Sequence, residues 1–130
     1  MKFKAKLAWV DGAWASNVLL ESDLRGFWTR IQPNASATES DGAEHLGCVV
    51  PGLVNAHSHA FQRAIAGLTE CSSQSGDDFW SWRDRMYRVA LRIGPDHLES
   101  IATWLYSEML QSGYTHVCEF HYLHRNPDGQ

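Results

Sequence analysis

The sequence predicts an α/β protein, in which short amino-terminal strands are followed by the beginning of a parallel, helix-covered sheet. Three observations support this class. Alternating strand patterns fill residues 2–32, a nearly continuous apolar run covers residues 48–56, and two helical patterns lead to a second strand at residues 114–120. A strand, crossover helices and another strand form the unit from which parallel sheets are built.

The amino-terminal part predicts strands over residues 3–10, 13–21 and 27–32. Asp11-Gly12 separates the first two, and Asp-Gly between alternating segments is a strong hairpin signal. Residues 33–47 are rich in Ser, Ala, Asn, Asp and Gly, which predicts an exposed connection. We therefore expect one β-rich part over residues 1–47 and a second part over residues 48–130.

The second part opens with the apolar run 48–56, as expected of a strand covered on both faces. Pro51-Gly52 interrupts this run, which leaves a bend open at that point. A helix is predicted over residues 78–92 behind an acidic cap. Another is predicted over residues 95–112, with proline in its first turn and glycine just past its end. Its apolar residues recur at helical spacing and predict a buried stripe: Leu98, Ile101, Ala102, Leu105 and Met109.

Composition excludes some classes of function. The net charge is −4 and there is no basic stripe, which argues against nucleic acid as the main partner. No apolar run reaches the roughly 18 residues that a membrane span needs. The amino terminus alternates charged and apolar residues, so it predicts a strand and not a signal peptide. Cys48, Cys71 and Cys118 lack paired spacing, so we expect free thiols in a reducing cytoplasm.

His57-Ser58-His59 follows the apolar run directly and is the most informative motif. Side chains alternate along a strand, so His57 and His59 point the same way. Their Cα atoms are then about 6 to 7 Å apart, from two rises of about 3.3 Å. Two imidazoles at that spacing can converge on one cation. The alternative is a pair of ordinary surface or hydrogen-bonded histidines.

Arg83 can also be judged from helical spacing. It falls on the face that carries Phe79, Met86, Tyr87 and Ala90, as the only charge in an apolar stripe. A guanidinium there needs an anionic partner, and a substrate carboxylate would serve. A structural ion pair and a side chain that reaches out to water are the alternatives.

The order of elements matches the start of a barrel of eight strand–helix units, a fold that needs about 250 residues. The chain contains two of these strands, so we expect it to be the front portion of a longer protein. Residues 51–59 resemble the first-strand signature of the amidohydrolase superfamily, metal-dependent hydrolases on a (β/α)8 barrel with a small β-sandwich. Residues 60–64, 78–83 and 119–124 resemble, more narrowly, the formimidoylglutamate deiminases of bacterial histidine degradation.

The resemblance implies zinc-dependent hydrolysis of N-formimidoyl-L-glutamate to N-formyl-L-glutamate and ammonia. It makes His57 and His59 zinc ligands, and Gln62, Arg83 and Tyr122 substrate contacts. The other two ligands and the proton-transfer residues of the family would lie beyond Gln130. No catalytic residue is then expected within the chain, and the chain alone should be inactive. The resemblance is compatible with a homodimer.

Two other functions stay open. One is a sibling deaminase acting on a purine, pyrimidine or triazine, for which Arg83 would have no carboxylate to bind. The other is a non-catalytic fragment whose histidines bind metal weakly or not at all. Without the family, Gln62 would be an ordinary side chain at a helix start and Tyr122 an aromatic packed at the rim.

Overall fold

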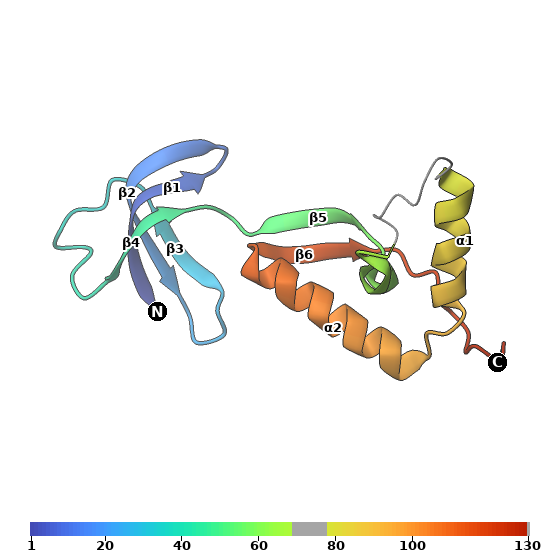
Figure 1. The fold of residues 1–130 in the computed structure, drawn as a ribbon. Coiled ribbons are helices and arrows are strands. Elements are labelled where there is room, and N and C mark those ends of the chain that lie inside the picture. The colour runs from blue at the N-terminus through green and yellow to red at the C-terminus, as the bar shows by residue number, and fades with distance from the viewer. Residues whose placement is uncertain (69–77, 130) are drawn as a thin grey trace. The chain divides into compact units, whose positions relative to one another are not determined.

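The computed structural model describes residues 1–68 and 78–129 (Figure 1). They form two compact units, Met1–Pro51 and Gly52–Gln130. The structure confirms the α/β class, with strands in both units and helices in the second. Within the described residues, no helix has the length and apolarity needed to cross a membrane.

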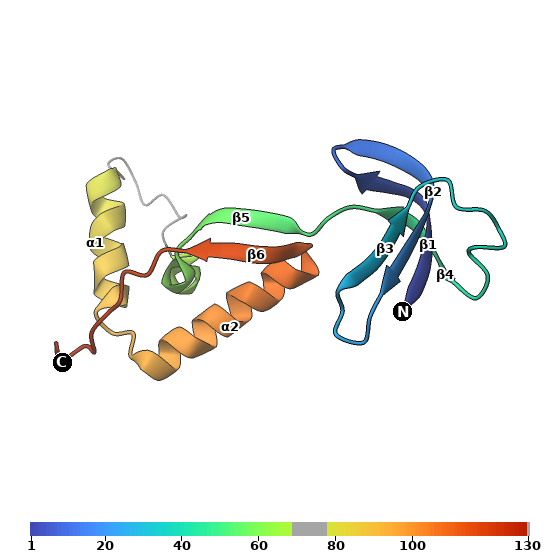
Figure 2. The same cartoon turned by 180° about the vertical axis from the view of Figure 1, so that it is seen from behind.

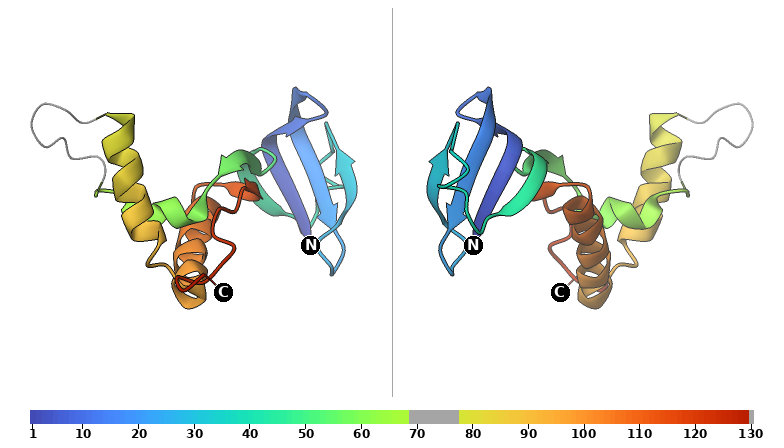
Figure 3. Two further views of the ribbon diagram at one scale, coloured as in Figure 1. Left: turned by 90° about the vertical axis from the view of Figure 1, so that its right-hand side faces the viewer. Right: turned by 90° about the vertical axis from the view of Figure 1, so that its left-hand side faces the viewer.

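The amino-terminal unit is a four-stranded sheet with strand order β3-β2-β1-β4 (Figure 3). Its strands are β1 (Lys2–Val10), β2 (Ala13–Ser22), β3 (Trp28–Gln32) and β4 (Glu44–Val49). The predicted hairpin is confirmed: β1 and β2 are antiparallel, and Val10 faces Ala13 across a two-residue turn. Both turn residues have positive φ, 49° at Asp11 and 81° at Gly12, as this tight turn requires. Small and branched side chains form its core: Ala5, Ala8, Val18 and Leu20.

The sequence predicts one strand over the apolar run at residues 48–56, with a bend left open at Pro51-Gly52. The structure instead divides this run between two strands. Its first part belongs to β4, which starts at Glu44 inside the predicted connection and pairs in parallel with β1. Its second part is β5 (Leu53–Ser58), in the second sheet. Proline removes a backbone donor at residue 51, and the chain at Gly52 passes very close to β6 (Tyr114–Glu119). A Cβ on Gly52 would lie 2.2 Å from the Thr115 hydroxyl oxygen.

The second unit contains the predicted crossover. Strands β5 and β6 are parallel neighbours, connected through η1 (Ala60–Ile65), α1 (Phe79–Ala90) and α2 (Pro95–Gln111) (Figure 2). Both long helices were predicted to within two residues at each end. Asp78 and Ser81 form a reciprocal capping box at the start of α1, and Pro95 occupies the first turn of α2.

The core of the second unit is small. Phe61, Ala90 and Ile93 are buried together, and apolar residues of α1 and α2 pack against them. The predicted stripe on α2 is half-buried and not buried as expected. All of its residues are partly exposed, and no described residue of α2 is fully buried. Arg63 of η1 binds Glu108 of α2 through two bonds of 2.8 and 2.9 Å. The hydrogen bond from Arg63 lowers the pKa of the Glu108 carboxyl.

The cysteines follow the prediction where they are described. Cys48 and Cys118 are free and exposed. Cys71 lies outside the described residues.

Candidate functional site

An irregularity in β5 lies between Asn55 and Ser58 and includes His57. Asn55 faces Val117 and Ser58 faces Glu119, so β5 takes three steps where β6 takes two. This is the one-residue excess of a β-bulge. The Asn55 side-chain oxygen accepts a hydrogen bond of 3.1 Å from the His57 amide. Sequence reasoning missed Asn55, although Asn side chains commonly bond the backbone two residues on.

His57, within the bulge, and His59, just after β5, lie side by side. Their ring centroids are 4.6 Å apart and the rings are nearly perpendicular, at 84°. Ser58, between them, is buried with 6% of its surface exposed, as expected if it points to the opposite face. The alternation predicted from the sequence therefore brings two imidazoles together at the end of β5.

The ring of His59 is held by the segment that follows β6. Its Nδ1 lies 3.0 Å from the Phe120 carbonyl oxygen. A carbonyl oxygen can only accept, so Nδ1 carries a proton, and in the neutral imidazole the lone pair is then on Nε2. The Tyr122 ring packs against the imidazole with centroids 4.8 Å apart. Sequence reasoning missed Phe120, because a main-chain acceptor leaves no trace in residue types.

The donor set fits half of a transition-metal site. Neutral imidazole nitrogens suit zinc, and a carbonyl partner on the other ring nitrogen is the usual way to orient such a ligand. Among residues 1–68 and 78–129, no group of three or more His, Cys, Asp and Glu side chains could hold a metal ion. The role of His57 and His59 as zinc ligands therefore stays a prediction.

A pocket of about 710 Å³ opens beside His59. Its walls come from η1, α1 and the segment after β6, and they are mostly apolar and aromatic. Three further predicted site residues line it: Gln62, Arg83 and Tyr122. His57 does not line the pocket but stands against His59. Substrate sites of small molecules have this character, apolar walls with a few convergent polar groups.

Arg83 lies on the helix face that the spacing predicted, since Phe79, Met86, Tyr87 and Ala90 line the same pocket. Its guanidinium carbon is 5.4 Å from the centre of the Trp80 ring and 5.2 Å from that of Tyr87. No carboxylate pairs with Arg83 within the described part of the chain. The stacking stabilises the cation in a half-buried position and leaves its hydrogen-bond donors for another partner.

The contacts of Gln62 and Tyr122 agree both with a packing role and with a role as substrate contacts. The Gln62 amide nitrogen lies 3.7 Å from the Met86 sulfur, which links η1 to α1. Tyr122 packs against Phe61 with centroids 5.8 Å apart. Both are packed at the pocket wall, and their role as substrate contacts remains a prediction.

Comparison with known proteins places the chain. The sequence profile of the amidohydrolase family matches residues 48–129. The chain belongs to the amidohydrolase family. The matched segment holds both histidines, Arg83 and Tyr122.

Two curated proteins from Pseudomonas aeruginosa are similar to the chain. Formimidoylglutamate deiminase is 50% identical over 127 residues, which cover 97% of this chain and 27% of that protein. 8-Oxoguanine deaminase is 32% identical over 87 residues, which cover 67% of this chain and 18% of that protein. The chain therefore spans about a quarter or less of the length of these relatives.

A solved structure agrees with this assignment. The crystal structure of an amidohydrolase from Brucella melitensis superposes with a TM-score of 0.88 at 41% identity. The match covers 99% of this chain and 28% of the Brucella chain.

Proposed function

We propose that the chain is the amino-terminal part of a cytoplasmic, zinc-dependent formimidoylglutamate deiminase of histidine degradation. The complete enzyme hydrolyses N-formimidoyl-L-glutamate to N-formyl-L-glutamate and ammonia on a (β/α)8 barrel preceded by a small β-sandwich. The observation that carries this proposal is the 50% identity to a formimidoylglutamate deiminase over nearly the whole chain. The pocket beside His59 supports it, because Arg83 is the one lysine or arginine among the described residues that line its mostly apolar walls.

His57 and His59 would hold the zinc ion through ring nitrogens. Bound zinc lowers the pKa of a coordinated water to near 7, which makes hydroxide available at neutral pH. The hydrogen bond between His59 Nδ1 and the Phe120 carbonyl would leave Nε2 for the ion. Two further ligands and the groups that protonate the departing ammonia would come from other parts of the complete barrel.

Arg83 would bind a carboxylate of the glutamate moiety. A guanidinium and a carboxylate form two parallel hydrogen bonds, which fix orientation as well as position. Gln62 and Tyr122, at the same pocket wall as His59, would contact the substrate between its carboxylate end and the reacting carbon. Held in this way, the formimidoyl group would lie next to the metal.

A second candidate is a deaminase of a purine or a similar heterocycle. The 32% identity to an 8-oxoguanine deaminase favours it, because the match covers two thirds of the chain. Such a substrate carries no carboxylate, so this function leaves Arg83 without a partner.

Ammonia release by the complete, zinc-loaded protein separates the two candidates. We expect turnover of N-formimidoyl-L-glutamate and none of 8-oxoguanine. The 130-residue chain alone, with added zinc, should release no ammonia above background. Turnover of the heterocycle alone would replace the first candidate with the second, and turnover by the isolated chain would contradict the need for further residues.

A further inference from the structure

Three consecutive residues around His59 are bonded to two consecutive residues at the end of β6. The Ser58 carbonyl accepts a bond of 2.9 Å from the Phe120 amide. The Phe120 carbonyl in turn accepts one of 3.0 Å from the His59 ring. The third contact is the only one made by a side chain of β6: the Glu119 carboxylate accepts a bond of 2.7 Å from the Ala60 amide.

The hydrogen bond to Glu119 holds the main chain next to His59. Ala60 follows His59 directly and is buried, with 2% of its surface exposed. It is also the first residue of η1, and no side chain of η1 caps that turn. A charge-assisted bond of 2.7 Å to a buried amide is among the stronger hydrogen bonds in proteins, and it pins the main chain on the carboxyl side of His59.

Glu119 also interacts with Tyr106 of α2. Burial raises the pKa of Tyr106, and the charge of Glu119 and a hydrogen bond to its carboxylate raise that pKa further. The second carboxylate oxygen of Glu119, Oε2, is buried and has no hydrogen-bond partner among the described residues. Burying a carboxylate oxygen without a partner costs free energy that a purely apolar side chain would not cost.

We propose that Glu119 is a positioning residue for His59: through the Ala60 amide it holds the imidazole at the angle needed to bind the metal. This inference rests on the proposed function, because it takes His59 as a zinc ligand. Glu119 does not line the pocket beside His59. It acts together with the Phe120 carbonyl, which sets the tautomer, whereas Glu119 sets the position of the main chain.

Metal affinity of the complete enzyme tests this role. The metal-free protein is titrated with Zn²⁺ against a chelator, and the Co²⁺-loaded form is examined by visible absorption. Glu119→Met removes the acceptor and should weaken zinc binding about 10- to 100-fold, the usual effect of losing an outer partner of a ligand. The cobalt spectrum should change as well. Glu119→Gln keeps an oxygen acceptor and should restore affinity to within a few-fold of wild type.

A matched control removes another carboxylate of the same unit. Glu108→Met breaks the pair with Arg63 but leaves the Glu119–Ala60 bond in place, so it should leave zinc affinity and the cobalt spectrum unchanged. If Glu119→Met fails to fold, Glu119→Asp replaces it, because its shorter side chain cannot reach the Ala60 amide and should also weaken zinc binding.

Wild-type zinc affinity and an unchanged cobalt spectrum in Glu119→Met or Glu119→Asp would overturn the proposal and leave Glu119 as a structural residue. That failure is distinct from failure of the proposed function. In the latter case the wild-type protein itself would bind no zinc, or would keep it after loss of His59.

Discussion

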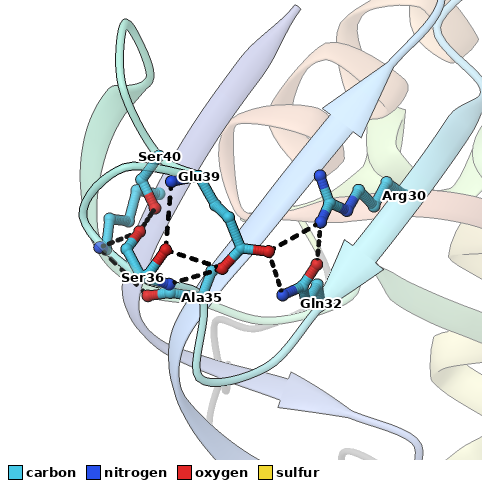
Figure 4. A network of polar contacts seen from close by, with 7 residues as sticks. Arg30, Gln32, Ala35, Ser36, Glu39 and Ser40 are labelled. Carbon is cyan, nitrogen blue, oxygen red and sulfur yellow. Dashed lines mark hydrogen bonds and ion pairs between the residues drawn. The ribbon is translucent and has the colours of Figure 1, made fainter.

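In the amino-terminal unit Arg30 is paired with Glu39, whereas in the second unit Arg83 lies between two aromatic rings with no carboxylate partner among the described residues. The Glu39 carboxylate also accepts hydrogen bonds from Gln32 and from the amide and hydroxyl of Ser36 (Figure 4). The first arginine is therefore paired within its own unit. The second keeps its donors free at a pocket wall.

The packing of the two units does not show the same contrast. Each has a cluster of buried apolar side chains. Each also exposes large apolar residues, among them Trp28 in the first unit and Phe79 in the second. The difference between the units therefore lies in the partners of their arginines and in the pocket that Arg83 lines.

The largest effect should come from the histidines of the second unit. His57→Ala or His59→Ala in the complete enzyme should remove bound zinc and activity together, because each deletes one of the two ring nitrogens placed for the ion. Elemental analysis measures the metal content. His45→Ala, at an exposed position of β4, is the matched control and should retain zinc. Unchanged metal content in both site variants would mean that these residues are not ligands.

The two arginines give the next largest difference. Arg83→Met should lower kcat/KM for formimidoylglutamate by roughly 30-fold to several thousandfold, since an unpaired substrate carboxylate costs about 2 to 5 kcal/mol. Zinc content and fold should be retained. Arg30→Met should leave kcat/KM unchanged, because its partner lies within the amino-terminal unit. Wild-type kcat/KM in Arg83→Met would make that residue structural and favour the heterocyclic substrate.

Gly52 lies in crowded surroundings and Gly47 in open ones. Gly52→Ala places a Cβ 2.8 Å from the Thr115 Cβ, and rotation of the threonine side chain cannot relieve that contact. We expect a loss of about 1 to 3 kcal/mol in the free energy of unfolding. A Cβ on Gly47 of β4 would meet nothing within 4 Å, so Gly47→Ala should be neutral. Chemical denaturation measures both, and equal stability would contradict the crowding at Gly52.

The smallest effect is a pH dependence confined to the amino-terminal unit. Hydrogen bonds from Ser36, first from its backbone, and then from Gln32 lower the pKa of Glu39 from 4.5 to about 2. The folded state thus favours the ionised carboxylate. Its stabilising contribution is complete above pH 4.5 and is lost as the pH falls toward 2.

Melting temperatures of the wild type and Glu39→Gln between pH 6 and pH 2.5 test this dependence. The variant should be less stable at pH 6, and the difference should shrink as the pH falls. A constant difference across this range would show that the carboxylate is not ionised preferentially in the folded state.

Local signals predicted much of the fold. Asp11-Gly12 identified the hairpin, and Asp78 and Pro95 marked the starts of the long helices, because turns and caps depend on a few neighbouring residues. The division of residues 48–56 between two sheets could not be predicted in this way. Apolar character predicts a strand covered on both faces, but Leu53 and Val54 are exposed in this chain, so that expectation was wrong for β5. The choice of sheet depends on partners far away in the sequence.

The site was predictable to a similar extent. Strand alternation placed His57 beside His59, and helical spacing placed Arg83 on an apolar face. The hydrogen bonds that His59 and Ala60 donate to Phe120 and Glu119 could not be predicted, because they join residues about 60 positions apart and one acceptor is main chain. The ring contacts of Arg83 also depend on how α1 orients side chains on successive turns.

The bulge in β5 makes the number of residues before His57 matter more than their identity. A substitution at Ala56 leaves the spacing between Asn55 and His57 intact. The hydrogen bond from the His57 amide to the Asn55 side chain is then kept. Inserting or deleting one residue shifts every later side chain to the opposite face of the strand. The His59 imidazole, which lines the pocket, and the neighbouring His57 imidazole would then turn to the opposite face together. Among homologous chains, this stretch should therefore accept changes in composition much more readily than changes in length.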